Sequence, residues 1–135
     1  MKLSRKCEYA CLAMIELSAH DIADYTKIEA ISTTWSIPRK FLEQILITLK
    51  NAGYLKSRKG AEGGYKLAKA ANEISLAEII RLIDGALAPV ESVSTYFYDN
   101  TPAEKHPGLM VIMRDIRDYI SNKLEQTTFA DLVKK

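Results

Sequence analysis

The stretch that decides the fold runs from residue 28 to residue 67. It reads IEAISTTWSIPRKFLEQILITLKNAGYLKSRKGAEGGYKL. Apolar residues recur at three- and four-residue intervals on both sides of Ser36–Pro38, which predicts two helices joined by a tight turn. A basic stretch with glycines at its tip follows, and this pattern predicts a short hairpin. Helix, turn, helix and hairpin in this order predict a winged helix-turn-helix.

The ends of these elements carry local signals. Thr26 and Glu29 have the spacing of a capping box, so we expect Thr26 to cap the first of the two helices. Pro38 suits the first position of the second helix, which should run to about Asn51 and end at Gly53. The positions of that helix expected to face inward are Phe41, Leu42, Ile45, Leu46 and Leu49.

The hairpin should form from strands at residues 54–58 and 65–67. Its tip is expected to take positive φ angles at three glycines, because glycine adopts them without steric cost. These are Gly60, Gly63 and Gly64. A glycine-rich stretch can also bind phosphate, but such loops precede a helix, whereas this one lies between two predicted strands. A wing is therefore favoured.

Helices are also predicted on both sides of this unit. Ser4 is a good N-cap for a first helix that reaches about His20. Ser75 and Glu78 form a second capping-box pattern, which begins a helix that ends at Asp84-Gly85. Prolines keep residues 86–107 irregular. A long helix follows at about residues 108–125, and a last short turn is capped by Thr128.

The expected fold class is therefore mainly α with a small β-wing. We divide the chain into three parts. Residues 1–85 form a winged helix-turn-helix domain that binds DNA, residues 86–107 form an irregular loop that could receive an effector, and residues 108–135 form a dimerisation helix with a C-terminal turn. The polar residues on the outer face of the second helix and the basic residues of the wing are the candidate DNA-binding residues. They are Arg39, Lys40, Glu43, Gln44, Arg58 and Lys59.

Composition sets the class of protein. The apolar fraction of 47% suffices for a packed core, and no uncharged apolar run approaches the roughly 20 residues of a membrane span. The start of the chain lacks the pattern of a signal peptide, so we expect a cytoplasmic protein without membrane contact. Residues 1–70 carry 12 Lys and Arg against 7 Asp and Glu, a net charge of +5, whereas residues 71–135 carry −3. A basic first half suits a polyanion such as DNA.

The long helix has a continuous apolar stripe although it lies outside the winged unit. Burial of that stripe is favourable by about 25 cal/mol per Å2, and a second copy of the chain in a two-fold dimer could provide it. The alternative is that the helix folds back on its own domain. The candidate dimerisation residues are Leu109, Ile112, Met113, Ile116, Tyr119 and Ile120.

Several ordered motifs resemble one family of bacterial regulators. The runs FLEQIL at residues 41–46 and GAEGGYKL at residues 60–67 closely resemble the IscR/NsrR/CymR-like winged-helix transcriptional regulators (the Rrf-two family). Residues 1–10, ISLAEII at residues 74–80 and TFADL at residues 128–132 resemble the opening, post-wing helix and C-terminal motif of the same family. The resemblance spans nearly the whole chain.

This resemblance implies a dimeric transcription factor, usually a repressor, that binds double-stranded DNA. The base-reading positions of the family fall on Lys40, Glu43 and Gln44, and its minor-groove wing residue falls on Lys59, with Arg58 beside it. General chemistry agrees, because glutamine can pair with adenine and glutamate can accept from cytosine. A second function remains open: a protein-interaction module in which the winged-helix dimer binds a partner enzyme or complex.

Two departures from the family pattern matter. Glu62 stands where the family usually has glycine, and its carboxylate would repel phosphates. Many relatives hold an iron–sulfur cluster through three cysteines after the post-wing helix, but residues 86–107 contain no cysteine. Cys7 and Cys11 fit core packing, so we expect no metal and no cofactor. A small-molecule or protein effector could instead use the aromatic run at residues 96–98; the alternative is that these aromatics only anchor the loop to the dimer.

No catalytic motif is found along the chain. A Gly-x-Ser-x-Gly elbow, a Walker loop and a metalloprotease histidine pair are all absent from the sequence. The chain is therefore not expected to be an enzyme.

Overall fold

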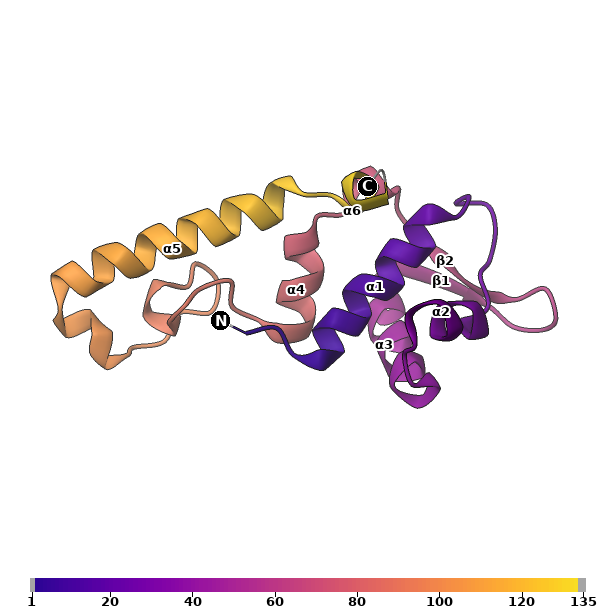
Figure 1. The fold of residues 1–135 in the computed structure, drawn as a ribbon, viewed down its shortest axis with the longest axis horizontal. Coiled ribbons are helices and arrows are strands. Elements are labelled where there is room, and N and C mark those ends of the chain that lie inside the picture. Colours follow the sequence, from indigo (N-terminus) through magenta and orange to yellow (C-terminus); the bar gives the residue numbers. More distant parts are fainter. Residues whose placement is uncertain (1, 134–135) are drawn as a thin grey trace.

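The helix-turn-helix and its wing form one end of an elongated molecule (Figure 1). The computed structural model describes residues 2–133. Its first half contains α1 (Arg5–Ala19), α2 (Ile28–Trp35), α3 (Arg39–Asn51), β1 (Leu55–Arg58) and β2 (Gly64–Leu67). The two strands pair antiparallel and project beyond the helices. The fold class predicted from the sequence, mainly helical with a small β-wing, is confirmed.

Helix α1 runs through the centre of the core. The Ser4 side chain caps it, accepting a hydrogen bond from the Cys7 amide at 3.0 Å. Asp84 in turn accepts hydrogen bonds from the amide and hydroxyl of Ser4 at 2.8 and 2.5 Å. The buried residues of α1 recur at helical spacing and are Cys7, Ala10, Ala13, Met14 and Leu17. The start of α1 is thereby tied to a residue 80 positions later in the chain.

The predicted cap of α2 is wrong. Thr26 does not cap the helix; its backbone pairs with Tyr65 in the wing, through N–O distances of 2.7 and 2.8 Å. Thr26 is also buried, so its side chain is not available at the helix end. Lys27 occupies the N-cap position, but its side chain makes no capping hydrogen bond. A long-range β-bridge has overridden a local capping preference.

The turn between α2 and α3 depends on Ser36, which adopts a left-handed conformation with φ of 54°. Ser32 closes the turn by donating its hydroxyl to the carbonyl of Ile37 at 2.7 Å. Pro38 is the N-cap of α3 rather than its first helical residue. Four of the five predicted inward positions of α3 are buried, but Phe41 is half exposed and meets the Tyr9 ring edge-on at a centroid distance of 6.1 Å.

The wing is a two-stranded ladder with Leu55 opposite Leu67 and Arg58 opposite Gly64. Gly60 and Gly64 have positive φ angles, as predicted, but Gly63 does not. Gly63 is required for a different reason: a Cβ atom there would lie 2.0 Å from the Arg58 carbonyl oxygen. The tip therefore folds back closely against its own strand.

Parts of the second half of the chain pack against the winged unit formed by the first half. Helix α4 (Leu76–Asp84) starts at a complete capping box of Ser75 and Glu78 and ends at Gly85, as the sequence predicts. The short helices η1 (Ala71–Glu73) and α6 (Phe129–Val133) lie near each other, and Phe129 is fully buried in the main core. The last turn of the chain thus packs against the winged unit, while α5 extends away from it (Figure 1).

The long helix α5 (Pro107–Gln126) is preceded by the loop of residues 86–106, which contains η2 (Glu91–Val93) and η3 (Pro102–Lys105). The His106 Nδ1 atom caps α5 by accepting from the Leu109 amide at 3.0 Å. Arg117 of α5 donates to the Val93 carbonyl at 3.0 Å, which holds the loop against the helix. Within residues 2–133, no helix is long and apolar enough to cross a membrane.

Candidate nucleic-acid interface

The outer face of α3 is polar and exposed. Arg39, Lys40, Glu43 and Gln44 all lie on this face, as the sequence predicts. The Arg39 guanidinium bridges two carboxylates, with N–O distances of 2.9 Å to Glu29 and 3.3 Å to Glu43. Because Glu29 belongs to α2, this pair of ion pairs links the two helices of the motif. It also orients Glu43 and compensates its charge.

Lys40 and Gln44 are in a different situation. Their side chains have no hydrogen bond or ion pair with any other residue in the described part of the chain. Both side chains are exposed, and they lie one helical turn apart on the same face. Lysine can donate to the guanine edge and glutamine can pair with the adenine edge in a major groove. This face of α3 therefore carries two free hydrogen-bond donors, Lys40 and Gln44, beside the ion pair of Arg39 and Glu43.

The wing presents its basic residues in two states. Arg58 donates to the Glu62 carbonyl at 2.9 Å, and its guanidinium lies 4.4 Å from the centroid of the Tyr25 ring. Lys66 lies 4.7 Å from the same ring. Lys59, at the tip, has no side-chain partner among residues 2–133. Arg58 and Lys66 are thus held in place by their contacts, whereas Lys59 at the tip is free.

Sequence reasoning missed three residues that shape the wing. Tyr25 lies between Arg58 and Lys66, and Lys27 donates from its Nζ atom to the Ala61 carbonyl at 2.5 Å. All these contacts connect the segment before α2 with the hairpin. The signal available in the sequence was weak: an aromatic residue and a lysine in a connector, far in sequence from the hairpin residues that they contact.

The residue pattern of this unit matches a known family. The model of the Rrf2 family, described as iron-dependent transcriptional regulators, matches residues 3–135. The chain belongs to the Rrf2 family. It is therefore a DNA-binding transcriptional regulator, and the family is not one of enzymes.

Individual relatives agree with this assignment. The chain is 35% identical over 132 residues to the regulator CymR of Bacillus subtilis, covering 98% of this chain and 89% of that protein. It is 29% identical to IscR of Erwinia tasmaniensis, covering 98% and 79%. The solved structure of B. subtilis CymR, titled as the global cysteine regulator, aligns with a TM-score of 0.81 at 34% identity over 99% of this chain and 97% of that one. T. potens IscR aligns with a TM-score of 0.76 at 27% identity, over 99% and 87%.

The family description raises the question of iron. The two cysteines lie one turn apart on α1; Cys7 is fully buried and Cys11 partly so. Hydrogen bonding to the Cys11 thiol, together with burial, raises the pKa of Cys7, which opposes the thiolate form that binds metal, whereas the same hydrogen bond lowers the pKa of Cys11. Within residues 2–133, no three His, Cys, Asp or Glu side chains are grouped to hold a metal ion. These residues do not fit a cysteine-held cluster.

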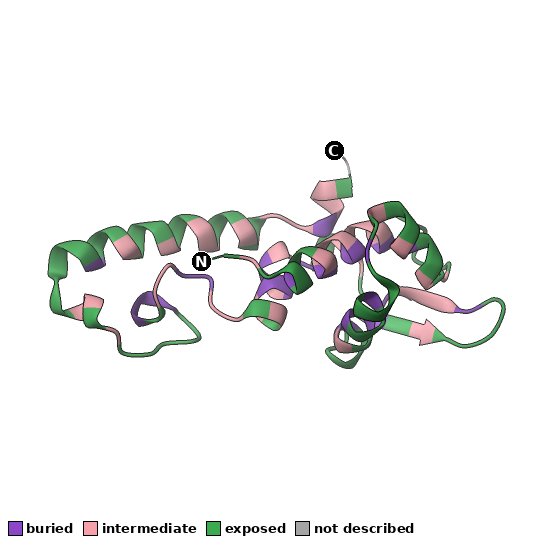
Figure 2. Cartoon of the chain, turned by 60° about the horizontal axis from the view of Figure 1, so that its bottom comes forward, coloured by how far each residue is buried: buried purple, intermediate pink, exposed green. Residues whose placement is uncertain are grey.

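The six candidate dimerisation residues divide into two groups on α5. Met113 packs against the cluster of Ala88, Val93 and Met110, and Ile120 packs near Cys7 and α4. The other four are exposed to solvent, and Figure 2 shows α5 largely exposed along its length. These four are Leu109, Ile112, Ile116 and Tyr119, and we call them the α5 stripe.

An open apolar groove of about 310 Å3 lies where α1, α4, the end of α5 and α6 meet. Its walls include Leu12, Ile15, Leu76 and Leu132. The protein thus leaves two apolar surfaces uncovered, the α5 stripe and this groove.

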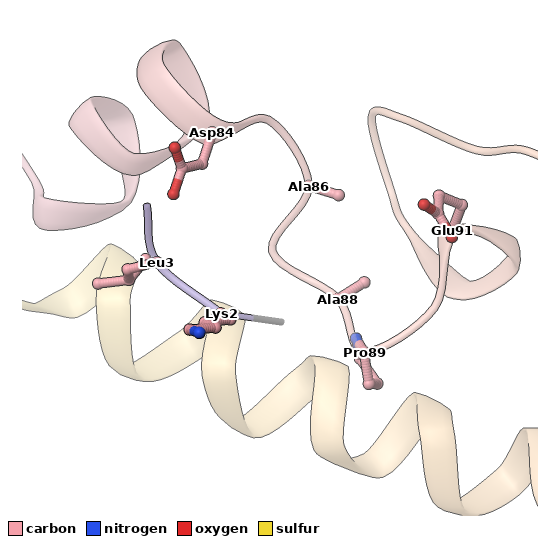
Figure 3. A pocket seen from close by; sticks show the side chains of 7 residues that line it. All are labelled: Lys2, Leu3, Asp84, Ala86, Ala88, Pro89 and Glu91. Carbon is pink, nitrogen blue, oxygen red and sulfur yellow. The ribbon is translucent and has the colours of Figure 1, made fainter. Parts of the chain in front are cut away.

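Besides a narrow space of about 10 Å3 beside Tyr96 and Phe97, two cavities adjoin the loop of residues 86–106. The smaller, about 240 Å3, is shown in Figure 3 and is lined in part by Lys2, Asp84 and Glu91. Its Asp84 carboxylate already accepts both hydrogen bonds from Ser4. The larger, about 520 Å3, lies between the loop and the start of α5. Of the predicted aromatic run, only Tyr98 lines this larger cavity.

Proposed function

We propose that the chain is a dimeric, sequence-specific repressor of transcription that works in the cytoplasm on double-stranded DNA. The observation that carries this proposal is the exposed face of α3, where Lys40 and Gln44 are free of partners, next to a wing with a free Lys59. In a helix-turn-helix the second helix enters the major groove, so these groups would meet base edges and the adjoining backbone.

Each candidate residue has a role in this proposal. Lys40 and Gln44 donate to base edges, and Glu43 accepts from a cytosine amino group while Arg39 holds it in position. Lys59 enters the minor groove or contacts a phosphate there. Arg58 remains beside it, stacked on Tyr25.

The dimer in this proposal forms through the long helix. Its support is the α5 stripe, four apolar residues exposed together, and the nearby apolar groove. A two-fold arrangement would cover these surfaces in both copies and place two reading heads on a palindromic site. Residues 1–85 would read DNA, residues 86–107 would respond to an effector, and residues 108–135 would hold the dimer.

Regulation in this proposal does not use a cysteine-ligated iron–sulfur cluster. The support is chemical: residues 86–107 have no thiol, and Cys7 is buried in the core. A small molecule or a partner protein acting on the loop would take the place of the cluster. Anaerobic purification with iron and sulfide should then yield colourless protein, and a stoichiometric iron–sulfur chromophore would refute this part.

A binding-site selection from random duplexes tests the base-reading assignment. Wild-type protein should enrich one palindromic sequence, and Gln44→Ala should relax the preference at one base pair in each half-site by about 1–3 kcal/mol. Glu43→Ala should do the same at a neighbouring position. Lys50→Ala, at the exposed end of α3, is the matched control and should leave the enriched sequence unchanged. An unchanged sequence with both test variants would refute the assignment.

A further inference from the structure

The larger cavity beside the loop has the size and lining of a ligand site. Its volume of about 520 Å3 falls within the range of small-molecule pockets. Residues from the loop and from the first turns of α5 line it, so it is bounded by a helix on one side. The lining residues include Tyr98, Glu104, Pro107, Met110, Val111 and Arg114.

Opposite charges stand at this cavity without neutralising each other. The Arg114 side chain has no hydrogen bond or ion pair with any residue of the described chain, residues 2–133. Glu104 accepts from the Tyr98 hydroxyl at 2.5 Å and from the Asn100 amide at 2.7 Å. Each carboxylate oxygen therefore has one donor and can still accept another. Glu104 is held in place, and Arg114 lacks an anion.

Apolar groups share the lining of the cavity with these charges. Met110 is 5% exposed and packs against Val93 and Ala88, so its position is fixed by the core of the loop. Val111 and Pro107 extend the apolar lining. The hydroxyl of Ser92, a buried residue, is hydrogen-bonded to the Thr101 hydroxyl at 2.7 Å. Ser92 therefore adds no strong free donor to the apolar part of the lining. The cavity therefore combines a cation, an anion and an apolar wall.

We propose that this cavity binds a free α-amino acid with an apolar side chain. The carboxylate of the ligand would pair with Arg114, its ammonium group would add to the free acceptor sites of Glu104, and its side chain would lie on Met110 and Val111. A guanidinium offers paired donors that match a carboxylate, which makes Arg114 the specific anchor. The role of this ligand as a regulatory signal rests on the proposed function.

The position of the cavity lets a ligand act on DNA binding. Arg114 and Met110 lie roughly opposite the α5 stripe around the helix, at 3.6 residues per turn, so a dimer built on that stripe leaves the cavity open. The loop also contacts the reading unit: Arg81 of α4 lies 4.8 Å from the Tyr96 ring centroid and pairs with Glu125 of α5 at 2.5 Å. A ligand that holds the loop more tightly against α5 therefore changes the contacts that Arg81 of α4 makes with Tyr96 and Glu125.

Calorimetric titration of the DNA-free, full-length protein with each of the twenty common amino acids tests binding directly. At least one apolar amino acid should bind with a Kd of about 1 mM or tighter. Its carboxamide, which lacks the carboxylate, and its deaminated acid, which lacks the ammonium group, should each bind about tenfold or more weakly. Absence of binding by all twenty, or equal binding of the carboxamide, would overturn the proposal.

Variants assign the site. Arg114→Met and Glu104→Gln should each weaken amino-acid binding about tenfold or more. Lys105→Met, which removes a neighbouring cation that does not line the cavity, is the matched control and should bind as wild type does. Unchanged affinity in Arg114→Met would place the ligand elsewhere and refute the site.

DNA binding is measured separately, by gel shift on the selected duplex with and without the amino acid. Binding of the amino acid without any specific DNA binding would refute the proposed function and leave the ligand site standing. Specific DNA binding without any amino-acid binding would refute the ligand site and leave the proposed function standing.

Discussion

Replacing Ile116 by glutamate should separate the proposed dimer. Its side chain is 40% exposed in the single chain, in a stripe whose other members, Leu109, Ile112 and Tyr119, are 41%, 55% and 72% exposed. Burial of a whole side chain of this kind contributes about 1.5–3 kcal/mol, so covering the exposed part of each contributes about 1 kcal/mol. Over both copies the stripe gives on the order of 8 kcal/mol.

That sum is comparable to the cost of association, on the order of 4–15 kcal/mol. The stripe alone therefore gives little surplus, and the loss of any member should matter. Ile116→Glu removes two such contributions and buries two unpaired carboxylates. We expect a loss of at least about 3 kcal/mol per dimer, which raises the dimer Kd more than about 100-fold.

Sedimentation velocity over a range of protein concentrations measures this change. Val111→Glu is the matched control: Val111 is 54% exposed on the same helix but lies on a different side from the stripe, so it should remain dimeric. Circular dichroism establishes that each variant is folded. A folded Ile116→Glu variant with the wild-type dimer Kd would show that the interface lies elsewhere.

Three further perturbations test the reading unit and its support. Lys59→Ala should lower the slope of log K against log salt by about 1 in DNA titrations, whereas Lys123→Ala on α5 should leave it unchanged. Gly64→Ala would place a Cβ atom 2.3 Å from the Thr26 carbonyl oxygen, and should lower the free energy of unfolding in urea by about 2–3 kcal/mol; a loss below about 0.5 kcal/mol would contradict the close approach. Burial and the nearby Glu78 carboxylate raise the pKa of Tyr54. The contribution of the protonated tyrosine to the free energy of unfolding is therefore complete below about pH 10 and is lost as the pH rises above that value. Tyr54→Phe should therefore show a smaller loss of thermal stability between about pH 9 and pH 11 than wild type shows.

Much of the fold could be predicted because its signals are local. The capping box of Ser75 and Glu78, the stop at Gly85 and the positive φ angles of Gly60 and Gly64 were each predicted from residues within a few positions of one another. Such preferences act in the same way wherever the segment lies in the fold. They also located the exposed face of α3, because a helical stripe of buried residues determines which positions remain outside.

Two of the errors, at Thr26 and Phe41, come from contacts between distant residues. Thr26 has good local capping chemistry, but its backbone pairs with Tyr65, 39 positions away, and this bridge removes it from the helix. Phe41 lies at the edge of the apolar stripe, where periodicity does not decide between core and surface, and it packs on Tyr9 outside the core. The cavity at Arg114 was also beyond sequence reasoning, because it depends on how a loop with only two short helical turns, η2 and η3, folds against α5.

The ion pairs of Arg39 change how the predicted DNA-binding residues should be understood. A carboxylate directed at DNA faces repulsion from phosphates, and that repulsion is lowest when a cation already compensates it. Arg39 does this for Glu43 while also binding Glu29 of α2, so the acceptor is oriented before DNA arrives. A preoriented acceptor loses little side-chain freedom on binding, so more of its interaction remains available for discriminating between bases. Lys40, Gln44 and Lys59, which have no such partner among residues 2–133, are the side chains left to supply new contacts. In the proposed function Arg39 thus acts mainly through Glu43, and selectivity should depend on this pair and on Gln44, while affinity depends on the free cations.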